Sequence, residues 1–200
     1  MRRARVARKT KETTIAVDVN LDGTGKVAVK TGIPFLDHMV TLLATHACWD
    51  LTLKAAGDLE VDLHHTNEDV GLVVGQALDQ ALGRRAGITR FGLAYVPMEE
   101  ALIRVVLDVS GRPKLVLGPS SVVRGKGRWA SSAAYDWGDA EHLLESLVRT
   151  AKLTLHIEVL SGEDFHHTCE AVFKGVGRAL EQAVRLHPRF KGVPSSKGQL

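Results

Sequence analysis

The chain has 200 residues, of which 44% are hydrophobic and 24% are charged, an ordinary balance for a globular protein with a sizeable core. Its formal net charge of +3 is too small to require a polyanionic partner. Six Lys and Arg nevertheless fall within the first eleven residues. We expect this basic arm to be solvated or to pack on a neighbouring subunit, rather than to bind nucleic acid or a membrane.

Cysteine content and hydropathy exclude several classes of protein. Cys48 and Cys169 form no C-x-x-C pair, so neither a disulfide framework nor a zinc ribbon is indicated. No apolar run approaches the length of about 18 residues that spans a bilayer. The composition is typical of a cytoplasmic protein in a reducing compartment.

In the first half of the chain, alternating apolar residues predict strands and apolar residues at helical spacing predict helices. In chain order these are strands at 13–19 and 26–29, expected to form a hairpin, a helix at 35–47, strands at 51–55 and 59–63, and a helix from His64 to Gly83.

The second half repeats this pattern. It predicts strands at 101–109 and 114–117, a long loop at 118–137, a helix at 139–152, a strand at 153–160 and a helix that begins near His166.

Both halves therefore run strand, strand, helix, strand, helix, with the short strand at 59–63 added in the first half, which indicates an internal duplication. We expect an α+β fold made of two fused repeats of a two-layer α/β unit, with helices on one face of each sheet. The first repeat, with its basic arm, would span residues 1–93, the second 94–187, and a C-terminal tail 188–200.

The duplication also copies a histidine motif. His-His-x-x-Glu occurs at 64–68 and again, 102 residues later, at 166–170. His38 precedes the first copy by 26 residues, and His142 precedes the second copy by 24. We expect each upstream histidine to complete the copy that follows it.

Residues three or four apart share a helix face, so His65 with Glu68, and His167 with Glu170, are expected to face one point. His64, at the junction between strand and helix, would point elsewhere, as would its counterpart in the second copy. Imidazoles and carboxylates without thiolates suit Mn, Fe, Ni or Zn, whereas the alternative is a buried polar network. The predicted ligands of two metals are His38, His64, His65, Glu68, His142, His166, His167 and Glu170.

Basic residues beside turns suggest an anion-binding side. Arg90, Arg112 and Lys174 lie next to turns or helix starts, and the tail carries Ser195 and Lys197. Guanidinium forks, an ammonium group and hydroxyls suit a phosphate monoester, although each residue alone could be solvated surface charge.

The whole chain resembles the imidazoleglycerol-phosphate dehydratase family of histidine biosynthesis. The motifs that carry this resemblance, in chain order, are Arg8–Thr13, Gly32–Met39, Gly57-Asp58, His64–Asp69, Pro97–Ala101, Ser110–Pro113, His166–Ala171, Phe173-Lys174 and Pro194–Gly198.

The resemblance implies two repeats related to the ribosomal protein S5 domain 2 fold, assembled into a 24-subunit shell without nucleic acid or membrane. It implies two Mn²⁺ per active site, with each site shared between subunits. The implied reaction removes water from imidazole glycerol phosphate to give imidazole acetol phosphate. The residues implied to bind substrate or phosphate are Glu12, Arg90, Arg112, Lys174, Ser195 and Lys197, and those implied to act in catalysis are Glu12, His65, Glu68, His167 and Glu170.

The proton to be removed in this reaction lies on a carbon without an adjacent carbonyl. An imidazolate held between two metals would expel the neighbouring hydroxyl and give a diazafulvene-like intermediate. Glu12 is the expected general acid/base, unless it only pairs with a Lys of the arm. Asp37 would either orient His38 or cap its helix.

Two other functions fit parts of the pattern. A dinuclear metallohydrolase, such as a phosphatase, would use the same ligands and phosphate cradle. A metal-storage or nucleic-acid-binding shell would use the basic arm. No Gly-rich nucleotide loop is present, so neither ATP nor NAD is indicated.

Overall fold

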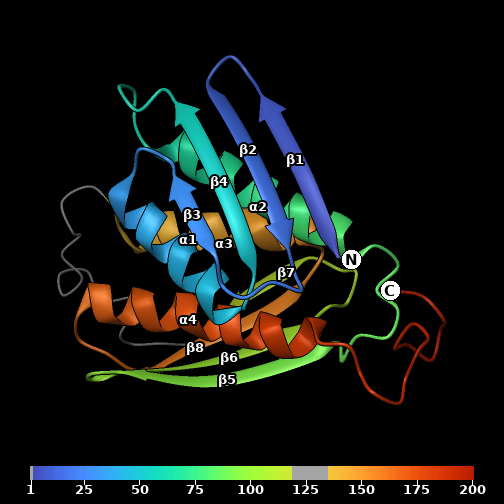
Figure 1. The fold of residues 1–200 in the computed structure, drawn as a ribbon. Coiled ribbons are helices and arrows are strands. Elements are labelled where there is room, and N and C mark those ends of the chain that lie inside the picture. The colour runs from blue at the N-terminus through green and yellow to red at the C-terminus, as the bar shows by residue number, and fades with distance from the viewer. Residues whose placement is uncertain (1, 119–134) are drawn as a thin grey trace.

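Two four-stranded sheets face each other with four helices between them in the part of the chain that this computed structural model describes, residues 2–118 and 135–200 (Figure 1). Most of the predicted loop at 118–137 lies outside the described residues. The first sheet has the order β1 (Arg3–Lys9), β2 (Thr13–Asn20), β4 (Asp50–Gly57), β3 (Val27–Lys30), and the second has β5 (Phe91–Met98), β6 (Ala101–Asp108), β8 (Thr154–Ser161), β7 (Lys114–Leu117).

The two sheets have one topology. In each, the first two strands form an antiparallel hairpin, and the second strand also pairs antiparallel with the fourth. The third strand, β3 or β7, runs parallel to the fourth, because the intervening helix carries the chain back across the sheet. The helices are α1 (Pro34–His46), α2 (His64–Leu82), α3 (Trp137–Ala151) and α4 (Phe165–Val184).

The core lies between each sheet and its helices. Alternate residues of the central strands are buried, such as Ile15 and Val17 in β2 and Ile103 and Val105 in β6. Helices α1 and α2 contact the first sheet, and α3 and α4 contact the second. The predicted fold, two repeats with helices on one face of each sheet, is confirmed, whereas the boundary at residues 93 and 94 stays a prediction.

Two sequence predictions in the first half are wrong. The strand at 26–29 does not form a hairpin with the strand at 13–19, since β3 pairs with β4 instead. Residues 59–63 are a turn and not a strand, and Val61 is 67% exposed there. The sequence analysis also missed β1 and β5, the first strand of each half.

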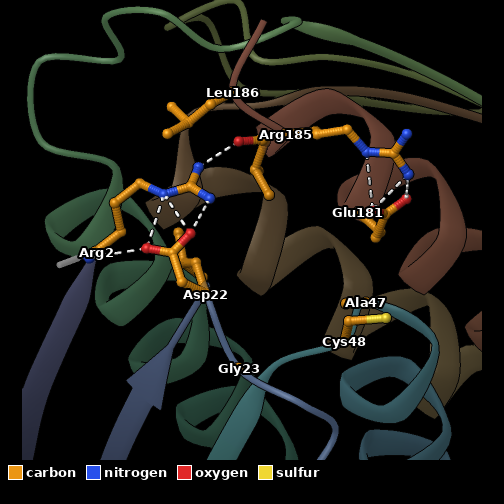
Figure 2. Close-up of a pocket in the computed structure, with 10 residues that line it drawn as sticks. Arg2, Asp22, Gly23, Ala47, Cys48, Glu181, Arg185 and Leu186 are labelled. Atoms are coloured by element: carbon orange, nitrogen blue, oxygen red, sulfur yellow. Dashed lines mark hydrogen bonds and ion pairs between the residues drawn. The ribbon is translucent and has the colours of Figure 1, made fainter. Parts of the chain in front are cut away.

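Most of the basic arm is strand β1, and its arginines pair with carboxylates of the chain. Arg3 and Arg5 both donate to Asp18 on the neighbouring strand, and Arg8 Nε lies 2.9 Å from Asp69 Oδ1. At the other end of the strand Arg2 pairs with Asp22 beside a pocket that also contains Cys48 (Figure 2). Each helix of the described chain is too short or too polar to cross a membrane.

The helices pack in two close pairs, α1 with α4 and α2 with α3, so each pair joins one half of the chain to the other. Glycines allow this approach. A Cβ atom on Gly75 would lie 2.3 Å from the carbonyl oxygen of Leu147, and one on Gly177 would lie 2.4 Å from that of Leu43. These contacts are equivalent in the two halves, because the glycines are 102 residues apart and the leucines 104.

We predict that Gly75→Ala and Gly177→Ala each destabilise the protein, by about 1–3 kcal/mol, because the added methyl group overlaps a backbone oxygen of the facing helix. Without that overlap, alanine would stabilise a helix interior by roughly 1 kcal/mol. Urea unfolding measures the change. Gly192→Ala is the control, since its Cβ would meet only ordinary contacts at 3.6 Å or more. A helix variant that unfolds at higher urea than wild type would contradict the argument.

Candidate metal centre

The first candidate ligand group, made of His38, His166 and Glu170, combines the N-terminal parts of α1 and α4. His38 Nε2 lies 3.1 Å from Glu170 Oε2, and His166 Nε2 lies 3.3 Å from the same oxygen. The two imidazole rings are 5.5 Å apart, centre to centre. Glu170 is only 8% exposed, whereas both histidines are open to solvent. A carboxylate at the base of the group therefore faces two accessible ring nitrogens.

The second group has the same composition and combines α2 with α3. The rings of His64 and His142 lie 4.5 Å apart, and His142 Nε2 is 4.0 Å from Glu68 Oε1. In each group, one donor atom per residue lies within 4.8 Å of the others. The chain thus has two groups of two imidazoles and one carboxylate, one on each of the two helix pairs.

The histidine that completes each motif comes from the other half of the chain. We expected His38 to join the motif at 64–68, but it joins the one at 166–170, and His142 joins the first. The cause is the cross-packing of the helices, because α1 packs on α4 and α3 on α2.

The expected pairing within each motif is also wrong. Glu68 shares its helix face with His64, four residues earlier, and Glu170 does so with His166. His64 is the first residue of α2 rather than a junction residue, so its side chain follows the helical direction toward position i+4. The second histidine of each motif points elsewhere.

The second histidines are held by carboxylates that the sequence analysis did not select. His65 Nδ1 lies 3.0 Å from Asp58 Oδ2, and His167 Nδ1 lies 2.9 Å from Glu100 Oε2. These hydrogen bonds raise the pKa of both imidazoles. The Glu100 carboxylate also accepts backbone N–H groups, the strongest from Asp164, and together with His167 they lower its pKa to about 2. Each acid lies in a turn next to the end of a strand, and this position was the feature of the sequence that could have identified it.

Glu12 and Asp37 take different places. Glu12 is exposed in the turn between β1 and β2. The pKa of His65 is raised mainly by its hydrogen bond to Asp58, and the negative charge of Glu12 raises it further. Asp37 accepts hydrogen bonds from the backbone N–H of Thr31, at 2.8 Å, and from its hydroxyl, at 2.6 Å. Asp37 therefore fixes the turn before α1 and neither orients His38 nor caps the helix, whose cap is Ile33.

Each ligand carboxylate has a cationic neighbour. Lys174 Nζ lies 2.5 Å from Glu170 Oε1, and Arg149 lies 3.0 Å from Glu68 Oε1. Burial disfavours the charged form of Glu170, but hydrogen bonds from Lys174 and His38 outweigh it and lower its pKa to about 2. Lys174, expected to bind phosphate, thus lies at the first ligand group, and Arg149 was not predicted.

Two of the predicted phosphate residues line one pocket. Arg90 and Ser195 border an open pocket of about 550 Å³, which residues of the tail help to line. Arg90 pairs with Asp108 and donates to the carbonyl of Pro194 at 2.8 Å, which ties the tail down. The side chains of Arg112 and Lys197 are exposed elsewhere, although the backbone N–H of Lys197 donates to Ser195 Oγ.

The donor chemistry of both groups fits a divalent metal ion. Imidazole nitrogen and carboxylate oxygen bind Mn, Fe or Zn, and three donors leave coordination positions for further ligands or substrate. The only described thiols are elsewhere: Cys169 is fully buried, and Cys48 lies in a separate pocket at the end of α1.

The chain is similar to proteins of one family along its whole length. The sequence model described as "Imidazoleglycerol-phosphate dehydratase" matches residues 31–180. A relative with that name from Mycobacterium sp. (strain KMS) is 52% identical over 100% of this chain and 96% of its own length. One from Mycolicibacterium gilvum (strain PYR-GCK) is 51% identical over 98% of each chain.

Solved structures agree with the sequence comparison. The crystal structure of IGPD from Pyrococcus furiosus in complex with (S)-C348 has a TM-score of 0.80 and 34% identity, and covers 98% of this chain and 100% of that one. Imidazoleglycerol-phosphate dehydratase from Staphylococcus aureus has a TM-score of 0.79 and 33% identity, with 92% and 99% covered.

We predict that the wild-type protein takes up about two divalent ions per chain and that His38→Ala takes up about one, because three donors define each group. Metal analysis after gel filtration measures the ratio. His156→Ala is the control, since this histidine is exposed on β8 and belongs to neither group. Equal metal content in the two variants would remove His38 from the ligands.

Proposed function

We propose, since the chain belongs to the imidazoleglycerol-phosphate dehydratase family and is thus a hydro-lyase, that it converts imidazole glycerol phosphate to imidazole acetol phosphate and water. The observation that carries this proposal is the pair of matching ligand groups, each made of two imidazoles and one carboxylate. Two equivalent groups suit a substrate whose imidazole ring has two nitrogen donors.

Two Mn²⁺ ions are the proposed cofactors. The residues that would hold them within one chain are His38, His166 and Glu170 for one ion, and His64, Glu68 and His142 for the other. When bound, the ions would acidify the substrate imidazole, whose electrons then help to expel the neighbouring hydroxyl.

His65 and His167 are the proposed fourth ligands, each binding a metal ion whose other three ligands belong to a neighbouring copy of the chain. In both, Nδ1 is occupied by a carboxylate, so Nε2 is left to bind outward. The donor atoms that converge with His64 are those of Glu68 and His142, and His65 is not among them. Sites completed in this way require assembly, for which we propose the 24-subunit shell that the family resemblance implies.

Glu12 is the proposed general acid/base. It lies in a turn open to solvent, near enough for its charge to act on His65. A carboxylate there would take the proton from the substrate carbon after the hydroxyl has gone, and a proton returns to carbon as the enol becomes a ketone. Its exposed position leaves the carboxylate free to reach a bound substrate.

The phosphate group of the substrate would bind at the basic residues. Arg90 and Ser195 line one open pocket beside the tail, and Arg112, Lys174 and Lys197 are proposed to join them in the assembled protein. Because Arg90 holds the carbonyl of Pro194, it also sets the position of the Ser195 hydroxyl next to it. Guanidinium and hydroxyl groups together suit a phosphate monoester.

We predict that chelation abolishes the dehydration of imidazole glycerol phosphate and that Mn²⁺ restores it. Product analysis also separates this reaction from hydrolysis, because a dehydratase gives a phosphorylated ketone and a metallohydrolase releases inorganic phosphate. Full activity in a rigorously metal-free preparation would exclude the metal mechanism. Phosphate release as the main product would exclude the dehydratase.

We predict that Glu12→Gln lowers kcat by about 10²–10⁴-fold, the usual contribution of a general acid/base, while substrate binding and metal content stay near wild type. Lys11→Gln is the matched control, because it changes a charge in the same exposed turn. Turnover and substrate binding are measured on the metal-loaded protein. A Glu12→Gln enzyme with near-normal turnover would remove Glu12 from this role.

A further inference from the structure

Each half of the chain holds its second histidine with a carboxylate, but the two carboxylates come from different segments. Asp58, which holds His65, follows strand β4. Glu100, which holds His167, lies in the turn between β5 and β6. In the two halves, the second histidine of the motif is therefore hydrogen-bonded by carboxylates at positions that are not equivalent in the duplication.

The equivalent positions follow from the strand pairing. Thr13 pairs with Gly57, and a Cβ on Gly57 would lie 2.0 Å from Thr66 Oγ1. In the second half, a Cβ on Gly162 would lie 2.5 Å from Thr168 Oγ1 and 3.4 Å from Ala101 Cβ. Gly57 thus corresponds to Gly162.

The residues that follow these two glycines then correspond to each other, as do the residues that precede the first residues of β2 and β6. Asp58, after Gly57, is the counterpart of Glu163, after Gly162. Glu12, before Thr13, is the counterpart of Glu100, before Ala101. The proposed acid/base and the carboxylate that holds His167 therefore occupy the same position in the two halves.

The hydrogen bonds of the two counterparts differ. Glu100 Oε1 accepts the backbone N–H groups of Glu163, at 3.1 Å, and Asp164, at 2.8 Å, while its Oε2 binds His167. These contacts fix the carboxylate against the start of α4. The carboxylate of Glu12 has no hydrogen-bond partner among the described residues. Its hydrogen bonds are made by the backbone: the N–H donates to Thr10 Oγ1, and the carbonyl accepts the N–H of Asp58 at 3.2 Å.

We propose that Glu100 is a positioning residue that holds the His167 ring with a hydrogen on Nδ1 and Nε2 free for a metal, and that Asp58 does the same for His65. The inference rests on the proposed function, in which both histidines are ligands. In the first half Asp58 makes the hydrogen bond to the histidine, which Glu100 makes in the second half. Glu12, the counterpart of Glu100, is therefore free to act on substrate. The duplication thus gives one structural and one catalytic carboxylate from one ancestral position.

Tautomer chemistry supports this division. A ligand histidine commonly donates its other N–H to a carboxylate, which fixes the tautomer and the ring orientation. Replacing Glu100 by Gln keeps an oxygen for the two backbone N–H groups but offers an amide N–H to His167 Nδ1. The imidazole must then carry its hydrogen on Nε2, the atom that would bind the metal.

The test is metal titration of the metal-free protein, with the tautomer of His167 read by nitrogen NMR. We expect Glu100→Gln and Asp58→Asn each to weaken Mn²⁺ binding by roughly 10–100-fold. The His167 hydrogen should move from Nδ1 to Nε2 in Glu100→Gln. Glu12→Gln should keep its metal affinity within about 2-fold. Glu99→Gln is the charge-matched control, because it removes an adjacent exposed carboxylate without touching the hydrogen bond.

A thermodynamic cycle separates positioning from a general loss of structure. In a His167→Ala background, Glu100→Gln should cause no further loss of metal affinity, whereas a further loss of 10-fold or more would mean that Glu100 acts through the fold of α4. Wild-type affinity in Glu100→Gln with an unchanged tautomer would overturn the proposal, and so would an equal loss in Glu12→Gln. The NMR result does not depend on turnover, so it stands apart from failure of the dehydratase assay.

Discussion

The close approach of helices at glycine is the constraint on which both ligand groups depend. Without a side chain at Gly75 and Gly177, α2 and α4 lie directly against the backbones of α3 and α1. Only at this separation can a histidine from one helix face a histidine and a glutamate from its neighbour. Because both contacts join opposite halves of the chain, neither half alone can form a complete group, and the duplicated units depend on each other for chemistry as well as packing.

The sequence predicted the long helices and the duplication, because apolar spacing and a motif repeated after 102 residues are local or additive signals. It failed where partners are distant. The parallel pairing of β3 with β4 depends on the crossover through α1, which no local pattern encodes. Strand β1 has one fully buried residue, Val6, so its sequence resembles a basic arm. Strand β5 exposes Phe91 and Leu93 and buries small residues, which reverses the usual polarity.

The sequence predicted the members of the two candidate ligand groups as a set, but it did not predict which of them lie together. Residue type and repetition identify His64, Glu68 and their counterparts as a set. Helical periodicity alone, however, permits both the i+3 and the i+4 neighbour, and only the packed helix pair selects the second. The carboxylates that hold the second histidines come from turns, 7 residues before His65 for Asp58 and 67 before His167 for Glu100. Such separations are set by sheet topology and leave no periodic signal.

The charges around the groups bear on how folding and metal binding are related. A carboxylate as buried as Glu170 is costly unless it has a cationic partner, and Lys174 supplies one from the next turn of the same helix. Glu68 is less buried and has Arg149 from the facing helix. Both carboxylates are thus paired with cations of the chain itself, so neither is an unpaired charge between the packed helices. The two groups differ in which carboxylate oxygen the cation occupies. In the first, the histidines face Glu170 Oε2 while Lys174 lies at Oε1, whereas in the second His142 and Arg149 share Glu68 Oε1. A metal entering the second group therefore competes with Arg149, and its affinity there reflects the difference between the two partners rather than the full attraction of a bare carboxylate.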